Sequence, residues 1–465
     1  MKRLSGYLVA VTFCLSITPL RAAERPNFVL IMVDDLGWRD LGYTGNEVIQ
    51  TPNMDALAWS GAVFTRAYAA APNCAPTRAC LMTGQYPPRH GVYTVVDERH
   101  APGSPQHKII AATSQAELAT EHFTLAEALR RHGYATGMVG MWNLGRGRRG
   151  PRTPTGQGFD SYIQPKDLGF ERDAYFNHKG EYLTDHLTDA GLAFINAQRG
   201  KPFCLYLAYH AVHSPFEPKP ELLRKYKGKC DDPAYAATVD ALDQSVGRVV
   251  KALDAAGVSE KTYIIFTSDN GGTRRYVAPL RGGKGTLYEG GLRVPAFICG
   301  PGIAPKCGYP DPISTIDFYP TLLELAGLPK PERQRLDGVS LAPLVLGKAK
   351  RLAPRRLFWH FPCYVGPGKP SSALLSGKYK LIEFFETGSV QLYDLSVDEG
   401  ESRDLSMDQP QRADKLHQEL RKMQKAMNAP RPMQANPNYD PGKVAKKDRG
   451  QRGKGKNEGL RRETR

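Results

Sequence analysis

Several features that would define a class of protein are missing from this chain of 465 residues. It has no Cys-x-x-Cys pair, which argues against a zinc site built from thiolates. No apolar run is long enough to span a bilayer, no motif of the common nucleic-acid-binding modules occurs, and there is no internal repeat. Hydrophobic residues nevertheless make up 41% of the chain, which is enough for a large buried core. We therefore expect a globular protein outside those classes.

The N-terminus has the pattern of an export signal. Lys2 and Arg3 precede an apolar stretch over residues 7–17, and the small residues Ala22 and Ala23 follow. The alternative, a short buried helix, fits the terminal position and the basic start less well. We predict a signal peptide over residues 1–23 and export to the periplasm or the medium.

The cysteine count is odd once the signal peptide is removed. Cys14 lies within the signal, and the seven that remain are Cys74, Cys80, Cys204, Cys230, Cys299, Cys307 and Cys363. An odd number in an exported protein sets one thiol apart from the others. If that thiol is Cys74, up to three disulfides can form among the rest, with a pairing that the sequence leaves open.

Positive charge is concentrated at the C-terminal end. The net charge is +16, and residues 443–465 hold ten Lys or Arg against three acidic residues in a glycine-rich stretch. This composition predicts a basic disordered tail, which we place over residues 430–465. The alternative is contact with a polyanion, and a sulfated or acidic glycan suits an exported chain better than nucleic acid does.

Short apolar runs alternate with helical patterns in the first three quarters of the chain. The predicted strands are residues 27–33, 135–140, 202–209 and 262–267. The predicted helices are residues 51–59, 123–132 and 234–256. This alternation indicates an α/β domain over residues 24–345, with a mostly parallel central sheet and helices on both faces.

The pattern changes after residue 345. Residues 374–385 and 390–395 are predicted to be paired short strands, and residues 411–427 a terminal helix. We therefore expect a smaller α+β domain over residues 346–429, packed on the first.

Oxygen-bearing side chains follow two of the predicted strands. Asp34 and Asp35 come directly after one, and Asp269 and Asn270 after another. Ligand sites of parallel sheets gather at the carboxyl ends of the strands. Carboxylates and a carboxamide suit Ca²⁺ or Mg²⁺ rather than Zn²⁺. An Asp-Asp pair alone also occurs as a plain strand end, but the second pair strengthens the case for a metal site.

The segment Cys74-Ala75-Pro76-Thr77-Arg78, continued by Leu81-Met82-Thr83-Gly84, resembles the signature of the type I (formylglycine-dependent) sulfatases. Other landmarks of that family occur in the same order: Asp34-Asp-Leu-Gly37, Thr51-Pro-Asn-Met-Asp55, Gln157-Gly-Phe-Asp160, His213-Ser-Pro215, Ser268-Asp-Asn-Gly-Gly272, Gly283-Lys284, Glu289-Gly-Gly291 and Leu392-Tyr-Asp-Leu395. The resemblance covers roughly residues 25–425. The alternative for Cys74, a buried or disulfide-bonded cysteine, does not account for these landmarks.

The resemblance implies an alkaline-phosphatase-like α/β fold and hydrolysis of a sulfate monoester. A maturation enzyme would oxidise Cys74 to formylglycine, whose hydrate is the nucleophile. Ca²⁺ would be held by Asp34, Asp35, Cys74, Asp269 and Asn270. Arg78 would orient the formylglycine, Lys284 would bind sulfate, and His213 would bind sulfate and protonate the leaving oxygen. Taken alone, His213 and Lys284 are equally consistent with ordinary loop residues.

One segment departs from the family pattern. The family has Gly-Lys-Trp-His-Leu-Gly, whereas this chain has Gly140-Met-Trp-Asn-Leu-Gly145. Met141 brings no charge and Asn143 cannot act as a base near neutral pH. The arginines that follow, Arg146, Arg148 and Arg149, either reach the site or form an exposed basic loop.

Three functions are therefore open. The first is hydrolysis of a sulfate ester, with a sulfated small molecule or glycan as the substrate. The second is a catalytically impaired sulfatase homologue that binds sulfated glycans, which the departure at Met141 and Asn143 favours. The third is a phosphonate or phosphodiester hydrolase on the same fold.

Overall fold

The computed structural model describes residues 25–96, 101–147 and 149–443. The predicted signal peptide, all but one residue of the stretch 443–465, and Arg148 lie outside these ranges. Within them, no helix has the length and apolarity needed to cross a membrane. The seven cysteines of the described part are all free thiols, so none of the disulfides that the sequence allowed is formed there.

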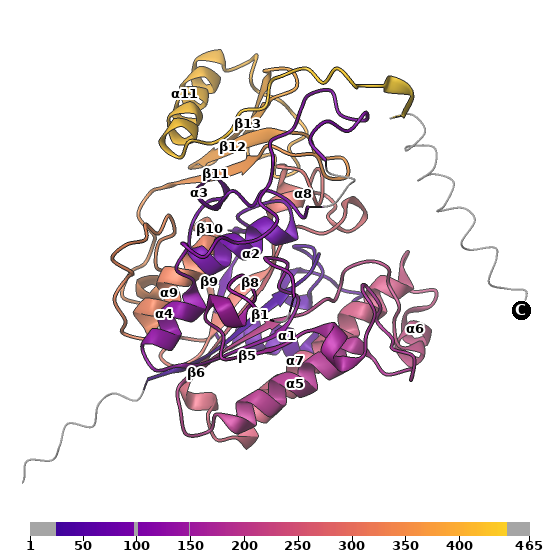
Figure 1. The fold of residues 1–465 in the computed structure, drawn as a ribbon, viewed down its shortest axis with the longest axis vertical. Helices are drawn as coiled ribbons and strands as arrows, with labels where there is room; N and C mark the ends of the chain where they lie inside the picture. Colours follow the sequence, from indigo (N-terminus) through magenta and orange to yellow (C-terminus); the bar gives the residue numbers. More distant parts are fainter. Residues whose placement is uncertain (1–24, 97–100, 148, 444–465) are drawn as a thin grey trace, which may run out of the picture.

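A large sheet of eight strands forms the centre of the molecule (Figure 1). In spatial order its strands are β5 (Ser161–Ile163), β4 (Ala135–Gly140), β6 (Phe203–Ala208), β1 (Asn27–Val33), β7 (Thr262–Ser268), β8 (Ala296–Cys299), β2 (Ala62–Phe64) and β9 (Cys307–Tyr309). The five strands from β5 to β7 are parallel, β8 runs antiparallel to both neighbours, and β2 pairs with β9 in parallel. The expected mostly parallel α/β sheet is thus confirmed.

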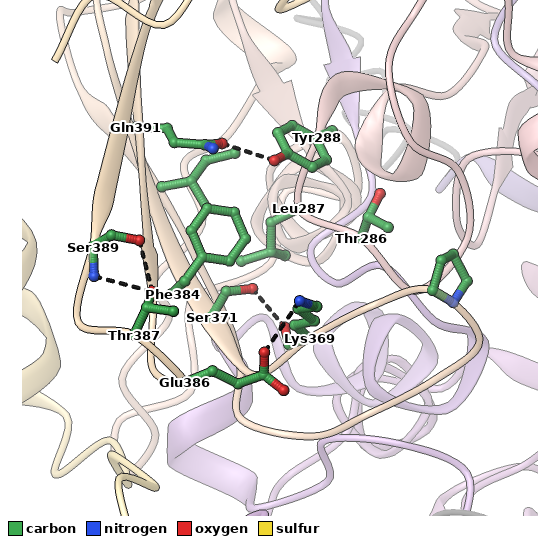
Figure 2. Close-up of a pocket in the computed structure, with 12 residues that line it drawn as sticks. Thr286, Leu287, Tyr288, Lys369, Ser371, Phe384, Glu386, Thr387, Ser389 and Gln391 are labelled. Carbon is green, nitrogen blue, oxygen red and sulfur yellow. Dashed lines mark hydrogen bonds and ion pairs between the residues drawn. The ribbon is translucent and has the colours of Figure 1, made fainter. Parts of the chain in front are cut away.

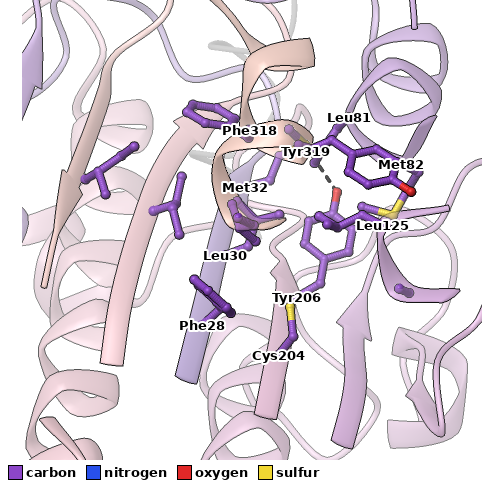
Figure 3. Packing of buried hydrophobic residues seen from close by; sticks show 14 of the residues in the cluster. Phe28, Leu30, Met32, Leu81, Met82, Leu125, Cys204, Tyr206, Phe318 and Tyr319 are labelled. Atoms are coloured by element: carbon purple, nitrogen blue, oxygen red, sulfur yellow. Dashed lines mark hydrogen bonds between the residues drawn. The ribbon is translucent and has the colours of Figure 1, made fainter. Parts of the chain in front are cut away.

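Helices cover both faces of this sheet because successive side chains of a strand point to opposite sides. On one side, Phe28, Leu30 and Met32 of β1 pack in a core with residues of α2 (Cys74–Thr83), α4 (Leu125–Arg131) and α9 (Phe318–Leu325), as Figure 3 shows. On the other side, Val29, Ile31 and Val33 pack with residues of α1 (Pro52–Trp59), α5 (Leu183–Ala197) and α7 (Pro233–Ala255). Every residue of β1 is buried, as its unbroken apolar sequence predicted.

A second sheet of four antiparallel strands follows in the last third of the chain. Its strands are, in spatial order, β11 (Arg356–Phe361), β12 (Ser371–Ser376), β13 (Tyr379–Phe384) and β14 (Val390–Asp394). One face packs on α11 (Pro410–Ala426), and the other packs on Tyr68, Leu287 and Leu292 of the larger part. The prediction of one strand over residues 374–385 was wrong, because Gly377, with a φ of 61°, ends β12 and starts a turn.

Short elements complete the chain. They are β3 (Ala67–Tyr68) paired with β10 (Ile313–Ser314), α3 (Pro87–His90), α6 (Pro220–Tyr226), α8 (Glu289–Leu292) and α10 (Ala342–Val345). Single 3₁₀ turns occur at Gly42–Thr44, Thr155–Gln157, Pro165–Leu168, Ser259–Lys261, Arg274–Tyr276 and Thr315–Asp317.

Residues 430–443, the first part of the expected basic tail, lie along the loop of residues 104–110 (Figure 1). Asn436 Nδ2 donates hydrogen bonds to the carbonyl oxygens of Ser104 and His107, at 2.9 Å each. Ala435 forms a β-bridge with Ile109. This part of the chain therefore packs on the folded body, for which its composition gave no signal.

Candidate active site

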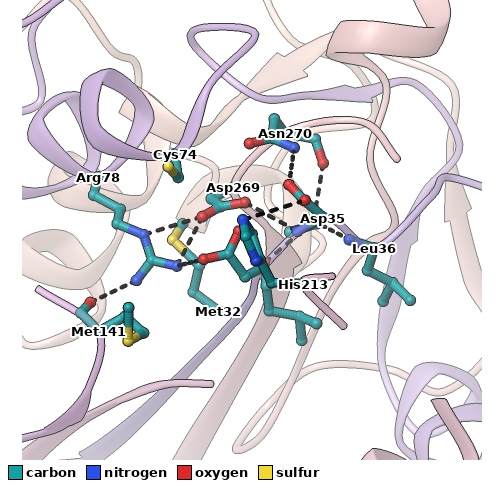
Figure 4. Close-up of polar contacts among 12 residues, drawn as sticks. Met32, Asp35, Leu36, Cys74, Arg78, Met141, His213, Asp269 and Asn270 are labelled. Atoms are coloured by element: carbon teal, nitrogen blue, oxygen red, sulfur yellow. Dashed lines mark hydrogen bonds and ion pairs between the residues drawn. The ribbon is translucent and has the colours of Figure 1, made fainter. Parts of the chain in front are cut away.

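Two neighbouring strands bring the predicted oxygen ligands together. Because β1 and β7 are parallel and in register at Val33 and Ser268, the residues that follow them meet at one edge of the sheet. Asp34, Asp35, Asp269 and Asn270 all lie there and all are buried. Figure 4 shows Asp35, Asp269 and Asn270 near Cys74 and Arg78 of α2.

Arg78 connects α2 to this cluster through hydrogen bonds and ion pairs. Its guanidinium donates to Asp269 Oδ2 at 2.7 and 3.0 Å and to Asp34 Oδ2 at 3.2 Å. A fourth bond, of 2.6 Å, goes to the carbonyl oxygen of Met141. Arg78 stands one helical turn after Cys74, so both side chains lie on the same face of the helix. The fixed guanidinium thus places Cys74 over the acidic residues.

Lys284 and His213 reach the same cluster from two loops. Lys284 Nζ lies 2.6 Å from Asp35 Oδ1 and 3.8 Å from Asp34 Oδ1. His213 Nδ1 donates to the carbonyl oxygen of Ser214 at 2.6 Å, which leaves Nε2 facing Asp35 Oδ2 at 3.9 Å. The structure therefore brings together all eight residues that the sequence singled out for this site.

Two buried oxygen atoms of the cluster lack hydrogen-bond partners. They are Asp34 Oδ1 and Asn270 Oδ1. Burying such atoms without a partner is unfavourable, and a hard cation that takes oxygen ligands would satisfy both. The residues therefore fit Ca²⁺. Asp34, Cys74 and Asp269 also offer one ligand atom each, all within 4.8 Å of one another.

The charges of the acidic residues are strongly coupled. Burial, followed by repulsion from Asp34, raises the pKa of Asp269 to about 7. Burial acts in the same direction on Asp34, but the positive charges of Lys284, His213 and Arg78 outweigh it and lower the pKa of Asp34. Asp34 is therefore held ionised beside a carboxyl group that resists ionisation. A bound divalent cation would remove this conflict.

Cys74 is poorly suited to act as a thiol. It is the first residue of α2, its side chain is buried, and Sγ donates to Asn73 Oδ1 at 3.2 Å. Burial raises the pKa of the thiol to about 12, even though Lys284 opposes the shift. The thiolate is the reactive form, so the unmodified side chain is inert near neutral pH.

The segment that departs from the family pattern follows β4. Met141 N donates to Ala208 O at 2.9 Å, and its carbonyl oxygen accepts the bond from Arg78, so its backbone belongs to the site. Asn143 has a φ of 58°, in the left-handed region that asparagine tolerates. The side chains of Arg146 and Arg149 are exposed, in line with the exposed-loop interpretation.

Sequence reasoning missed two residues beside His213. His210 is 3% exposed, and its ring centre lies 5.2 Å from that of His213. Asp173, on the loop before α5, completes a trio in which each residue offers one ligand atom within 4.8 Å of the others. Burial lowers the pKa of His210 below its ordinary value. The His-x-x-His spacing at 210–213 was an available signal, but nothing in the sequence links Asp173 to it.

A pocket of about 300 Å³ opens between the segment after Lys284 and the small sheet (Figure 2). Tyr288 and Phe384 contribute aromatic rings, and Lys369, Glu386 and Gln391 contribute polar groups. Thr286 lines the pocket and lies two residues after Lys284 in the sequence. Two residues of extended chain span at most about 7 Å. The pocket therefore adjoins the acidic cluster along the chain.

Comparisons with known proteins agree on one family. The family model described as Sulfatase matches residues 26–328, and the model described as N-sulphoglucosamine sulphohydrolase, C-terminal, matches residues 283–428. A sulfatase of Formosa agariphila is 33% identical and covers 92% of this chain and 94% of its own. Human arylsulfatase A is 34% identical over 83% of this chain and 84% of its own. A solved structure of Ps i-CgsB in complex with k-i-k-neocarrahexaose superposes with a TM-score of 0.72 at 29% identity, covering 86% of this chain and 93% of that one.

Proposed function

The chain belongs to the sulfatase family, and we propose that it hydrolyses sulfate monoesters on carbohydrates with a formylglycine made from Cys74 and one Ca²⁺ ion. Like its relatives, it is a sulfuric ester hydrolase. One observation carries the finer proposal. Cys74 starts a buried helix directly over Asp34 and Asp269, which Arg78 joins to that helix.

The formylglycine and the metal would each supply a chemical group that the unmodified side chains do not provide. The formylglycine hydrate supplies a hydroxyl nucleophile, and Ca²⁺ lowers the negative charge of the bound sulfate. The proposed metal ligands are Asp34, Asp35, residue 74, Asp269 and Asn270. The side-chain oxygen atoms of Asp34 and Asn270 that lack hydrogen-bond partners support this assignment. The free N–H groups at the start of α2 favour an anion at the same place.

The chain's own residues then bind and orient the ester. Lys284 Nζ, 2.6 Å from Asp35, holds a positive charge beside the cluster, where it can contact a sulfate oxygen. The hydrate would supply the oxygen that forms the new bond to sulfur as the bond from sulfur to the ester oxygen breaks. That ester oxygen takes a proton from His213 Nε2, a step that requires the doubly protonated ring because Nδ1 keeps its own proton in the bond to Ser214. The Nδ1 bond to Ser214 fixes the ring with Nε2 facing the site.

Carbohydrate is the substrate class that the surroundings favour. The related N-acetylgalactosamine-6-sulfatase of dog, 32% identical over 81% of this chain, acts on a sulfated sugar by its name, and the structure of Ps i-CgsB holds a neocarrahexaose. The pocket beside Lys284 offers aromatic faces together with charged and amide groups. Such mixed lining binds the apolar and hydroxyl faces of a sugar.

The direct test is mass spectrometry of the tryptic peptide that spans residues 67–78. After coexpression with a formylglycine-generating enzyme, we expect this peptide to be lighter by the difference between a thiol and an aldehyde. The protein should then release the alcohol from an aryl sulfate far faster than from an aryl phosphate or a phosphonate diester. Only unmodified cysteine, in a host that modifies other sulfatases, contradicts the proposed nucleophile.

A second candidate function is an impaired homologue that binds sulfated glycans. Met141 and Asn143 favour it, because they place no titratable side chain at the end of β4. Fully modified protein that binds a sulfated oligosaccharide but never releases the alcohol would establish this alternative.

The maturation of the chain and its division into parts follow from the same proposal. We propose that residues 1–23 direct export and that a formylglycine-generating enzyme acts on Cys74 before the chain folds, because the buried thiol is inaccessible afterwards. The proposed catalytic domain spans residues 24–345 and the smaller one residues 346–429, which contains β11 to β14 and α11.

A further inference from the structure

We propose that Asp173, His210 and His213 form a second metal site, which binds a borderline divalent ion such as Zn²⁺ and thereby withdraws His213 from catalysis. The three residues offer one ligand atom each, and all three atoms lie within 4.8 Å of one another. Ligand atoms of a tetrahedral Zn²⁺ are about 3.4 Å apart, given Zn–N and Zn–O bonds of roughly 2.1 Å. Small side-chain rotations are therefore sufficient to close the site.

An unpartnered buried atom points to a missing ligand here. His210 is 3% exposed, and its Nε2 has no hydrogen-bond partner. Buried polar atoms are normally paired, so this nitrogen calls for an explanation. Its ring lies beside that of His213, with 5.2 Å between the ring centres. A cation between the two rings would give His210 Nε2 the partner that the described residues do not provide.

The neighbouring groups hold both histidines in place. His213 Nδ1 donates to the Ser214 carbonyl oxygen at 2.6 Å, so Nε2 is the ring nitrogen that remains available to a metal ion. A backbone carbonyl on the other ring nitrogen is the usual support of a metal-bound histidine. Tyr175 packs on His210 at 5.1 Å between ring centres and donates through its hydroxyl to the His213 carbonyl oxygen at 2.7 Å. Asp173 is exposed, and its ion pair with Arg172, at 3.7 Å, is exposed as well, so the carboxylate can turn toward the pair.

The ligand chemistry separates this site from the calcium cluster. Two imidazoles and one carboxylate suit Zn²⁺, Co²⁺ or Ni²⁺, whereas the calcium cluster offers oxygen atoms. The two sites share no proposed ligand, but they adjoin at His213, whose Nε2 lies 3.9 Å from Asp35 Oδ2 and which lies within 4.8 Å of a carboxylate oxygen of Asp34. The binding site stands independently of the proposed function. The inhibition rests on that function, because it requires His213 Nε2 to protonate the leaving oxygen.

The test is a Zn²⁺ titration of the full, calcium-loaded protein by calorimetry, with Co²⁺ absorption as a second probe. We expect one equivalent of Zn²⁺ to bind without release of Ca²⁺. The variants His210→Gln and Asp173→Asn should each bind Zn²⁺ at least about tenfold more weakly. Asp173→Asn changes an exposed residue, so it is informative even if His210→Gln does not fold. The control His186→Gln removes a half-buried histidine outside the trio and should leave Zn²⁺ binding unchanged.

Activity provides the second readout. Zn²⁺ should inhibit sulfate release by the protein without substitutions. The variant Asp173→Asn should keep its activity and lose its sensitivity to Zn²⁺. Absence of a Zn²⁺ equivalent beyond the calcium, or equal Zn²⁺ affinity in both variants, overturns the proposal. Inhibition that persists in both variants shows that Zn²⁺ acts elsewhere and overturns it as well. If no sulfate ester is turned over, the Zn²⁺ titration alone decides whether the second metal site exists. Failure of the metal-site proposal and failure of the proposed hydrolase function therefore remain distinguishable.

Discussion

The ends of β1 and β7 and the ends of β4 and β6 line the same edge of one sheet, yet they differ in how closely they follow the family pattern. The first pair carries Asp34, Asp35, Asp269 and Asn270, all buried and linked to α2 through Arg78. The second carries Met141 and Asn143, where the resemblance predicts a lysine and a histidine. On the same side, however, His210 and Asp173 stand beside His213. We therefore expect that the proposed metal binding and the proposed release of sulfate can be tested separately.

The largest effect is expected where the pattern is intact. Asp269→Ala should abolish Ca²⁺ binding and lower kcat/KM by about 10³-fold or more, because a metal that stabilises charge in the transition state contributes several kcal/mol. Removing this carboxylate also leaves Arg78 with only one of its two acidic partners. Calorimetric titration with Ca²⁺ and turnover of an aryl sulfate measure the two effects.

The matched control for Asp269 is Asp55→Ala. Asp55 is a partly buried carboxylate that accepts bonds from Tyr43 N at 2.8 Å and Thr51 Oγ1 at 3.0 Å, outside the cluster. The control should lower the melting temperature but bind Ca²⁺ as before. Normal Ca²⁺ binding by Asp269→Ala would remove this residue from the proposed metal site.

The next largest effect is expected at Met141 and Asn143, which stand where the family has a lysine and a histidine. If the missing lysine and histidine serve mainly the release of sulfate, a burst of alcohol should precede slow turnover, with a burst size equal to the formylglycine content. Met141→Lys combined with Asn143→His should speed the slow phase by about 10²–10⁴-fold, the usual contribution of a general base, and the burst much less. Histidine tolerates the positive φ of Asn143, so the backbone should accept it. Stopped-flow and steady-state assays separate the two phases.

Other results of that experiment are equally specific. Fast turnover that the double substitution lowers would mean that another group, with the buried His210 as one candidate, has taken over the release step. Absence of any burst in fully modified protein would favour the glycan-binding alternative instead.

The sequence predicted one side of this comparison better than the other, for a physical reason. Apolar runs such as residues 27–33 identify buried parallel strands, and the polar residues after parallel strands must meet at one edge, so the proposed metal-binding residues could be located without a structure. Asp173 could not be found in this way, since it comes from a loop whose path depends on tertiary packing. The packing of residues 430–443 was missed because their basic, proline-rich composition gave no periodic signal.

Calcium removal should have a moderate effect on stability. A ligand that binds only the folded state at 100 times its Kd stabilises that state by about 2.7 kcal/mol. Chelation should therefore lower the melting temperature by several degrees, and added Ca²⁺ should restore it. Differential scanning fluorimetry measures the shift, and Asp269→Ala should show none. If the melting temperature of the protein without substitutions responds to neither chelator nor Ca²⁺, the cluster of Asp34, Asp35, Asp269 and Asn270 is not a metal site.

The smallest expected effect lies outside both strand pairs, in the pocket beside Lys284. Lys369 lines this pocket, is 53% exposed and pairs with Glu386 at 3.1 Å. Lys369→Ser should raise the KM for a sulfated oligosaccharide about two- to fivefold, as expected for one exposed charge, and leave the KM for a small aryl sulfate unchanged. Lys378→Ser is the matched control, since Lys378 is 51% exposed, also ion-paired, and not a lining residue. Both KM values measured at low and high salt complete the test, because added salt should reduce the difference between the two variants. Equal behaviour of the two variants would mean that the oligosaccharide leaves the site in another direction.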